Sequence, residues 1–245
     1  MDFLKKLFSD NDGPSERQIA RTLKHVTQAH GDPASRVSAM ERLAGWKTPE
    51  AANALLRRFT IQVPQETMDL EEKQYTVQLL TGMGRAAVEP ILNFVRAEPE
   101  VTWPARALRE ILPKEEYIAA LKDTLERLGG GYTRWPEAKV VLIEHLPEEA
   151  LPLVRTIILG FLEDEDDDVC IAAAYYLARS DDEEVREQLI ETLLHAEARP
   201  RVRGRIFELF CDREFAVKGY RKKVEEVIQE PFYLTAKGTV KRRPS

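Results

Sequence analysis

Reactive and metal-binding side chains are scarce in this sequence. Its 245 residues include 2 cysteines and 4 scattered histidines. His25 and His30 are five residues apart and lack Cys or carboxylate partners at ligand spacing. No Gly-x-Ser-x-Gly, His-Glu-x-x-His or glycine-rich phosphate-loop motif is present. The sequence therefore predicts a protein that is not an enzyme and that has no metal site or cofactor.

Long hydrophobic runs are also missing. The longest, Val140–Ile143 and Ile157–Leu162, are far shorter than the ~20 residues that a spanning helix needs. Met1–Asp12 lacks the apolar core and cleavage site of a signal peptide. We expect Cys170 and Cys211 to be reduced, buried thiols. They lie near the start of one predicted helix and near the end of another, so their positions are not equivalent. These features predict a cytoplasmic location.

What the sequence does contain is a repeated helix pair. In the stretch from Asp166 to Leu194, apolar residues crowd one face of a first helix and continue at helical spacing in a second. Such a pair cannot bury its own apolar faces and needs similar pairs on either side. The ends of the expected first helices recur in steps of 36, 33, 34, 31 and 33 residues, at Leu43, Leu79, Leu112, Leu146, Leu177 and Phe210.

The residues around these anchors select one family of repeats. The tetratricopeptide and ankyrin signatures are absent. Each unit has an acidic or proline-marked start, a branched residue, a stripe of small residues and a leucine, as in Asp32–Val37, Asp167–Val169 and Arg199–Arg203. With Gly84–Leu92 as a turn into a second helix, this pattern resembles short HEAT-like repeats, a type also found in bilin lyases.

The resemblance implies an all-α fold, a right-handed α-solenoid (α-α superhelix) of about six helix pairs, and leaves the function open. We expect an N-terminal segment with a hinge over residues 1–14, the solenoid over 15–230 and a basic tail over 231–245. Around Lys237-Gly238 the tail alternates apolar and polar residues, which favours a small hairpin.

Several helix starts can be placed from local motifs. Ser15 and Gln18 predict a capping box at the start of a helix over Ser15–Ala29. Asp32-Pro33 and Thr48-Pro49 each predict an N-cap followed by proline at the first helical position. Ser180 and Glu183 predict another capping box. Ile61–Leu70 is interpreted as a spacer loop, although long loops can also carry recognition.

The most unusual local feature is the loop Gly129–Pro136, GGGYTRWP. It combines backbone freedom with Tyr132, Arg134 and Trp135, and exposed aromatic residues beside arginine are typical of hot spots in protein interfaces. In the alternative, which we favour for the tryptophans, Trp103 and Trp135 stack on each other as core between repeats. The three loop residues are therefore candidate partner contacts.

Charge is unevenly distributed along the chain. The net charge is −6, but residues 199–245 hold 13 Lys and Arg against 6 Asp and Glu, a net of +7, while the rest holds 23 against 36, a net of −13. The acidic excess peaks in two turns, Glu163–Asp168 and Asp181–Glu184, which we interpret as solvated helix caps. The basic end could contact phosphate groups or an acidic protein, or be a solvated cap of the stack. Its candidate residues are Arg201, Arg203, Arg205, Lys222, Lys223, Lys241, Arg242 and Arg243.

The first residues form an amphipathic segment. Its apolar side chains, Phe3, Leu4, Leu7 and Phe8, share one side of a helical wheel. We expect this segment to cap the first repeat; docking on a partner and contact with a membrane surface are the alternatives.

These features predict a non-catalytic scaffold or adaptor that binds another protein. The second helices would line an inner face, where Arg57, Arg58, Arg96, Arg155 and Arg186 could meet an acidic partner segment. The alternative is a nucleic-acid-associated module that uses the basic end. DNA glycosylase activity, known among HEAT-like proteins, is disfavoured because no carboxylate lies one helical turn after Trp103 or Trp135.

Overall fold

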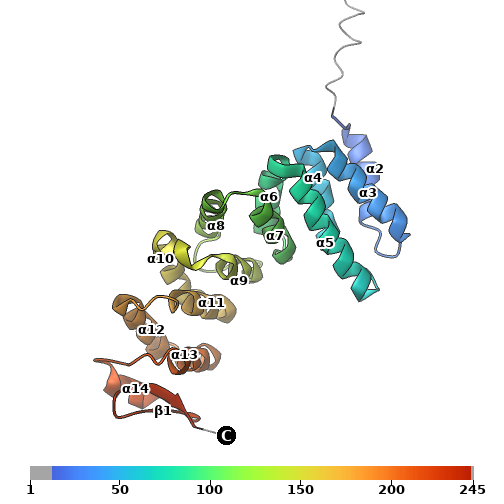
Figure 1. The fold of residues 1–245 in the computed structure, drawn as a ribbon. Coiled ribbons are helices and arrows are strands. Elements are labelled where there is room, and N and C mark those ends of the chain that lie inside the picture. The colour runs from blue at the N-terminus through green and yellow to red at the C-terminus, as the bar shows by residue number, and fades with distance from the viewer. Residues whose placement is uncertain (1–12, 244–245) are drawn as a thin grey trace, which may run out of the picture. The chain divides into compact units, whose positions relative to one another are not determined.

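The structure is a computed structural model that describes residues 13–243, and helices make up most of that range (Figure 1). The α-helices are α2 (Glu16–Val26), α3 (Pro33–Trp46), α4 (Pro49–Leu56), α5 (Glu66–Met83), α6 (Val88–Ala97), α7 (Thr102–Ile111), α8 (Lys114–Leu128), α9 (Pro136–His145), α10 (Leu151–Gly160), α11 (Asp167–Leu177), α12 (Glu183–His195), α13 (Pro200–Asp212) and α14 (Arg221–Val227). Short 3-10 turns η1 (Arg57–Thr60), η2 (Gly84–Ala87), η3 (Glu148–Ala150) and η4 (Phe161–Glu163) accompany them. Between residues 13 and 243 the only strands are β1 (Phe232–Leu234) and β2 (Val240–Arg242). This confirms the all-α class.

The chain forms two compact units, Met1–Ala120 and Leu121–Ser245, with the boundary inside α8. In the first unit, helices pack against their neighbours in sequence and against the helix two places further along. Thus α3 contacts α4 and α5, α5 contacts α7, and α4 contacts α6 (Figure 1). The core of this unit is apolar and at most 1% exposed at Leu43, Leu55, Leu80, Ile91 and Leu108.

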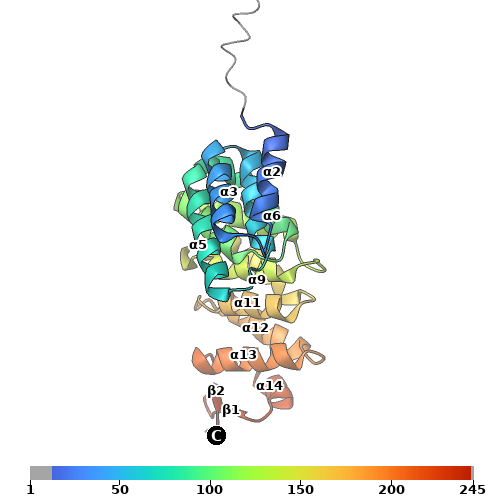
Figure 2. The same ribbon diagram turned by 90° about the vertical axis from the view of Figure 1, so that its right-hand side faces the viewer.

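The second unit repeats this packing. Helix α11 lies between α9 and α13, and α12 contacts α13 and α14 (Figure 2). The hairpin follows as the sequence predicts: β1 and β2 pair antiparallel, with Phe232 opposite Arg242. The ring of Phe232 stacks on Phe207 of α13, with ring centroids 5.5 Å apart. The hairpin therefore covers apolar surface of the last long helix.

Three of the predicted caps are confirmed. Ser15 and Gln18 form the capping box of α2, although this helix ends at Val26 and not at Ala29. Asp32 accepts a hydrogen bond from the Ser35 N–H at the start of α3, and Thr48 accepts one from the Ala51 N–H at the start of α4. Each motif acts within one helical turn, so no distant contact is needed to specify it.

Two local predictions are wrong. Helix α12 has Asp182 as its N-cap, whereas the Ser180 hydroxyl accepts a hydrogen bond from the Asp182 N–H. Ser180 therefore shapes the turn and the helix begins at Glu183. The predicted spacer Ile61–Leu70 is a loop only in its first half, because α5 begins at Glu66. Glu66 and Asp69 then lie in the first turn of α5, where acidic side chains are favoured by the helix dipole.

Candidate functional site

The loop between α8 and α9 displays the most exposed aromatic side chain among residues 13–243. Tyr132 is 83% exposed. Two glycines before it adopt backbone conformations with positive φ, +62° at Gly129 and +92° at Gly131, which residues with a side chain disfavour. The Gly129 N–H donates to the carbonyl of Leu125 and closes α8. The chain can then turn sharply before α9 begins at Pro136.

A buried lysine on α9 fixes the base of this loop. The side chain of Lys139 is fully buried, and its Nζ donates to the Gly131 carbonyl at 2.8 Å and to Asp164 Oδ2 at 2.7 Å. The ammonium group also lies 5.5 Å from the centre of the Phe161 ring. A buried ammonium is tolerated only where charge and hydrogen-bond partners replace its water. Because one of those partners is the loop backbone, the position of Gly131 is tied to the core.

The carboxylate partner of Lys139 is itself held in place. Asp164 Oδ1 accepts a hydrogen bond from the Asp166 N–H at 3.0 Å, and Arg199, the residue before α13, donates to the Asp164 carbonyl at 2.8 Å. Arg199 also forms an ion pair with Asp167 at 2.7 Å. The loop base is thus connected to three parts of the second unit: α9, the turn before α11, and the start of α13.

Beyond this base, the loop carries a cation–aromatic pair. The guanidinium of Arg134 lies 5.0 Å from the centre of the Trp135 ring. Arg134 is exposed, and Trp135 is half-buried. Stacking on an aromatic face leaves the in-plane N–H groups of an arginine available to a partner. Tyr132, Arg134 and Trp135 therefore offer apolar area and hydrogen-bond donors on a loop with a fixed base.

The predicted role of the tryptophans as core is wrong. Trp103, near the start of α7, is also only half-buried, and Arg106 lies 4.9 Å from the centre of its ring. Small residues on the same helices are buried in the core instead, such as Ala105 of α7 and Ala138 of α9, which are at most 2% exposed. Each tryptophan lies at the margin of the apolar interior, covered on one face by an arginine.

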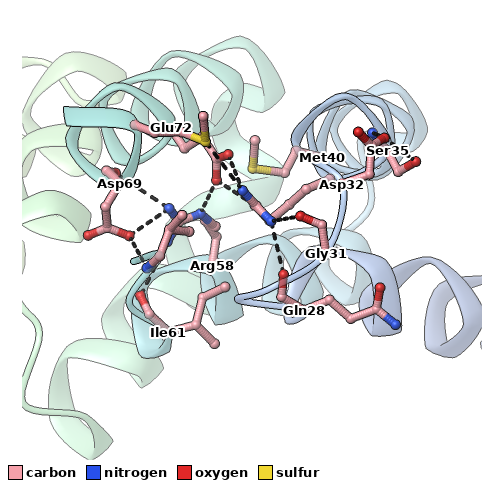
Figure 3. Close-up of polar contacts among 12 residues, drawn as sticks. Gln28, Gly31, Asp32, Ser35, Met40, Arg58, Ile61, Asp69 and Glu72 are labelled. Atoms are coloured by element: carbon pink, nitrogen blue, oxygen red, sulfur yellow. Dashed lines mark hydrogen bonds and ion pairs between the residues drawn. The ribbon is translucent and has the colours of Figure 1, made fainter. Parts of the chain in front are cut away.

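Arg58 is not a partner contact. It is completely buried in the first unit and donates to Glu72 Oε2 and Asp69 Oδ1, both at 2.8 Å (Figure 3). Arg36 approaches the same carboxylate from α3, with Nε to Oε2 and Nη2 to Oε1 distances of 2.7 Å. Glu72 therefore bridges two buried guanidinium groups. This network joins α3, η1 and α5.

Asp69 completes the network. Burial acts to raise the pKa of its carboxyl group, but hydrogen bonds from the Val63 N–H, Lys73 and Arg58 outweigh burial and leave the pKa lowered. The carboxylate is thus charged at neutral pH, as its cationic partners require.

The other predicted inner-face arginines make intramolecular contacts. Arg57 pairs with Glu98, and Arg155 pairs with Asp182 and Glu184 at 2.7 and 2.8 Å. The guanidinium of Arg186 lies 5.0 Å from the centre of the Phe215 ring. Arg96 donates to Asn93. Arg57, Arg96, Arg155 and Arg186 therefore each have a contact within the chain, and their role toward a partner stays a prediction.

Much of the basic end is likewise paired within the chain. Arg201 pairs with Asp168, Arg205 with Glu208, Lys241 with Glu214, and Arg243 with Glu230. Two nitrogens of Arg203 are buried, and Lys223 lies over the ring of Tyr220. Lys222 and Arg242 are exposed. The acidic turns and the basic end are therefore partly complementary to each other, which sequence spacing did not reveal.

Phe3, Leu4, Leu7 and Phe8 lie outside the described residues.

The two cysteines are free thiols, and Cys170 is fully buried as predicted, whereas Cys211 is only partly buried. Its Sγ donates to the Leu162 carbonyl at 3.1 Å, and burial raises the pKa of the thiol to about 11. The thiolate is the species that reacts with alkylating reagents.

In a Cys211→Ser variant at pH 8, iodoacetamide should leave Cys170 unmodified until the protein is unfolded with denaturant. Mass spectrometry of the native protein checks this; rapid native labelling would contradict the burial of Cys170.

The described residues thus define a protein built from packed α-helices and one antiparallel hairpin. Among residues 13–243, no group of His, Cys, Asp and Glu is arranged to hold a metal ion, and no helix is long and apolar enough to cross a membrane. No protein-family model, curated protein or solved structure matches this chain.

Proposed function

We propose that this protein is a non-catalytic adaptor that binds another protein through the loop at residues 129–135. The observation that supports this most is the combination of a buried Lys139 at the loop base with the exposed Tyr132 beyond it. Interface hot spots are enriched in tyrosine, tryptophan and arginine. A fixed loop also loses less conformational entropy on binding than a mobile one.

The repeat pattern supports the same proposal. Helices that pack in succession, each on the helix two places along, agree with HEAT-like helix pairs. We also propose the right-handed α-solenoid of about six pairs that the resemblance implies, and the cytoplasmic location that the cysteines and the short hydrophobic runs predict. Arrays of this kind are used widely to present binding surfaces.

Capture of partners by full-length variants tests the loop. The protein would be immobilised, exposed to nuclease-treated extract of the cells that produce it, and the retained proteins quantified. Tyr132→Ala and Trp135→Ala should each reduce capture of a stoichiometric partner by about tenfold or more, the effect expected of hot-spot residues. Tyr233→Ala is the matched control, because Tyr233 is 39% exposed on the hairpin.

The control should capture the partner as the unmodified protein does. Loss of capture in Tyr233→Ala but not in the loop variants would overturn the assignment of the site. In a parallel capture from untreated extract, retention of nucleic acid that disappears after nuclease treatment, with no protein captured in either arm, would overturn the adaptor function and favour a role for the basic end.

A further inference from the structure

A cationic groove lies in the first unit, away from the loop in sequence. It has a volume of about 420 Å³ and runs between α2 and α3. Arg21 and His25 line it from α2, and Ser35, Ser38 and Arg42 line it from α3. Residues three or four apart lie on one face of a helix, so the two helices bring these five polar side chains to one place.

The two arginines have no anionic partner in the chain that the structure describes. Both are exposed, and neither forms an ion pair within residues 13–243. Among the other exposed arginines of the first unit, Arg57 pairs with Glu98 and Arg85 with Glu116. Their charge is available to a ligand.

The single carboxylate that lines the groove is already engaged. Asp32 accepts hydrogen bonds from the Ser35 hydroxyl at 2.7 Å and from the Ser35 N–H at 2.8 Å. These hydrogen bonds from Ser35 lower the pKa of Asp32. Its negative charge lies at the N-terminus of α3, where the helix dipole offsets it. The cationic side chains therefore dominate the remainder of the groove.

We infer that this groove binds a small phosphate monoester. Two guanidinium groups can each donate paired hydrogen bonds to phosphate oxygens, and the imidazole of His25 and the Ser38 hydroxyl add further donors. The volume is in the range of small-molecule sites. Ala34 and Ala39 also line the groove, and they provide apolar surface for the organic part of the ligand. This inference does not depend on the proposed adaptor function.

Calorimetric titration of the full-length protein at low ionic strength tests the inference, with glycerol 3-phosphate, inorganic phosphate and succinate as separate probes. The monoester should bind saturably and more tightly than either of the others. A combined Arg21→Gln and Arg42→Gln variant should bind it at least about tenfold more weakly, the effect of losing charged hydrogen bonds. Arg17→Gln is the matched control, since Arg17 is exposed on α2 but does not line the groove.

The control should retain the affinity of the unmodified protein. Absence of saturable binding, equal binding of succinate or of inorganic phosphate, or undiminished binding by the double variant would each overturn the inference. Thermal unfolding of the variants keeps the comparison interpretable, because the substituted side chains are exposed and their unfolding midpoints should match that of the unmodified protein.

Discussion

Glu72→Gln is expected to destabilise the first unit by about 3–5 kcal/mol, the cost of breaking a buried ion pair by removing one partner. Glu72 is 5% exposed and receives hydrogen bonds from both Arg36 and Arg58. Glutamine is nearly isosteric but uncharged, so two buried guanidinium groups would share the charge of Asp69 alone. Urea unfolding should show a large fall in the midpoint.

The neighbouring residue provides the control for this prediction. Glu71 is exposed on the same helix, and Glu71→Gln should change the free energy of unfolding by no more than about 0.5 kcal/mol. Equal stability of the two variants would mean that the network around Glu72 does not hold the helices together.

Lys139→Met is expected to have an effect of similar size in the second unit. The substitution leaves Asp164, which is 1% exposed, with a buried carboxylate that lacks its cation, at a cost of about 3–5 kcal/mol. It also removes the hydrogen bond to the Gly131 carbonyl. Urea unfolding should show the loss of stability, and amide hydrogen exchange over residues 129–135 should become faster.

Two further variants make this prediction specific. Lys122→Met, which removes a cation paired with Glu126 at the surface, should cost no more than about 1 kcal/mol. Adding Asp164→Leu to Lys139→Met should restore much of the lost stability, because both buried charges are then removed. Unchanged exchange in the loop of Lys139→Met would contradict the anchoring role of Lys139.

The parts of the fold that the sequence predicted correctly are those specified over short distances. The cap of α3 at Asp32 acts within one turn, and the hairpin strands β1 and β2 are joined by a short turn. The error at Ser180 arose where several possible caps stand close together: Asp182 lies nearer to the first free N–H groups of α12. Local motifs compete there, and the sequence pattern alone does not rank them.

The buried charges could not be predicted because their partners are distant in sequence. Arg58 meets carboxylates 11 and 14 residues further along, and Lys139 meets one 25 residues away. One signal for Lys139 was present: it lies between Ala138 and an apolar run that begins at Val140. A charged residue in such a position is buried only if a partner is brought to it.

The candidate loop was partly predictable. Its composition identified Tyr132 and Arg134 correctly as exposed side chains, because glycines and polar residues surround them. The half-buried position of Trp135 and the anchoring by Lys139 depend on how α9 packs in the second unit. The groove between α2 and α3 was not predicted, because its residues come from two helices and meet only when those helices pack together.

The most direct measurement for the adaptor function is site-specific photocrosslinking at position 132. A photoreactive amino acid would replace Tyr132 in one sample and Tyr233 in another, and both would be irradiated in the native extract after nuclease treatment. We predict one dominant protein adduct from position 132, weakened by an added Trp135→Ala substitution, and none from position 233. Protein adducts from position 233 alone would contradict the account.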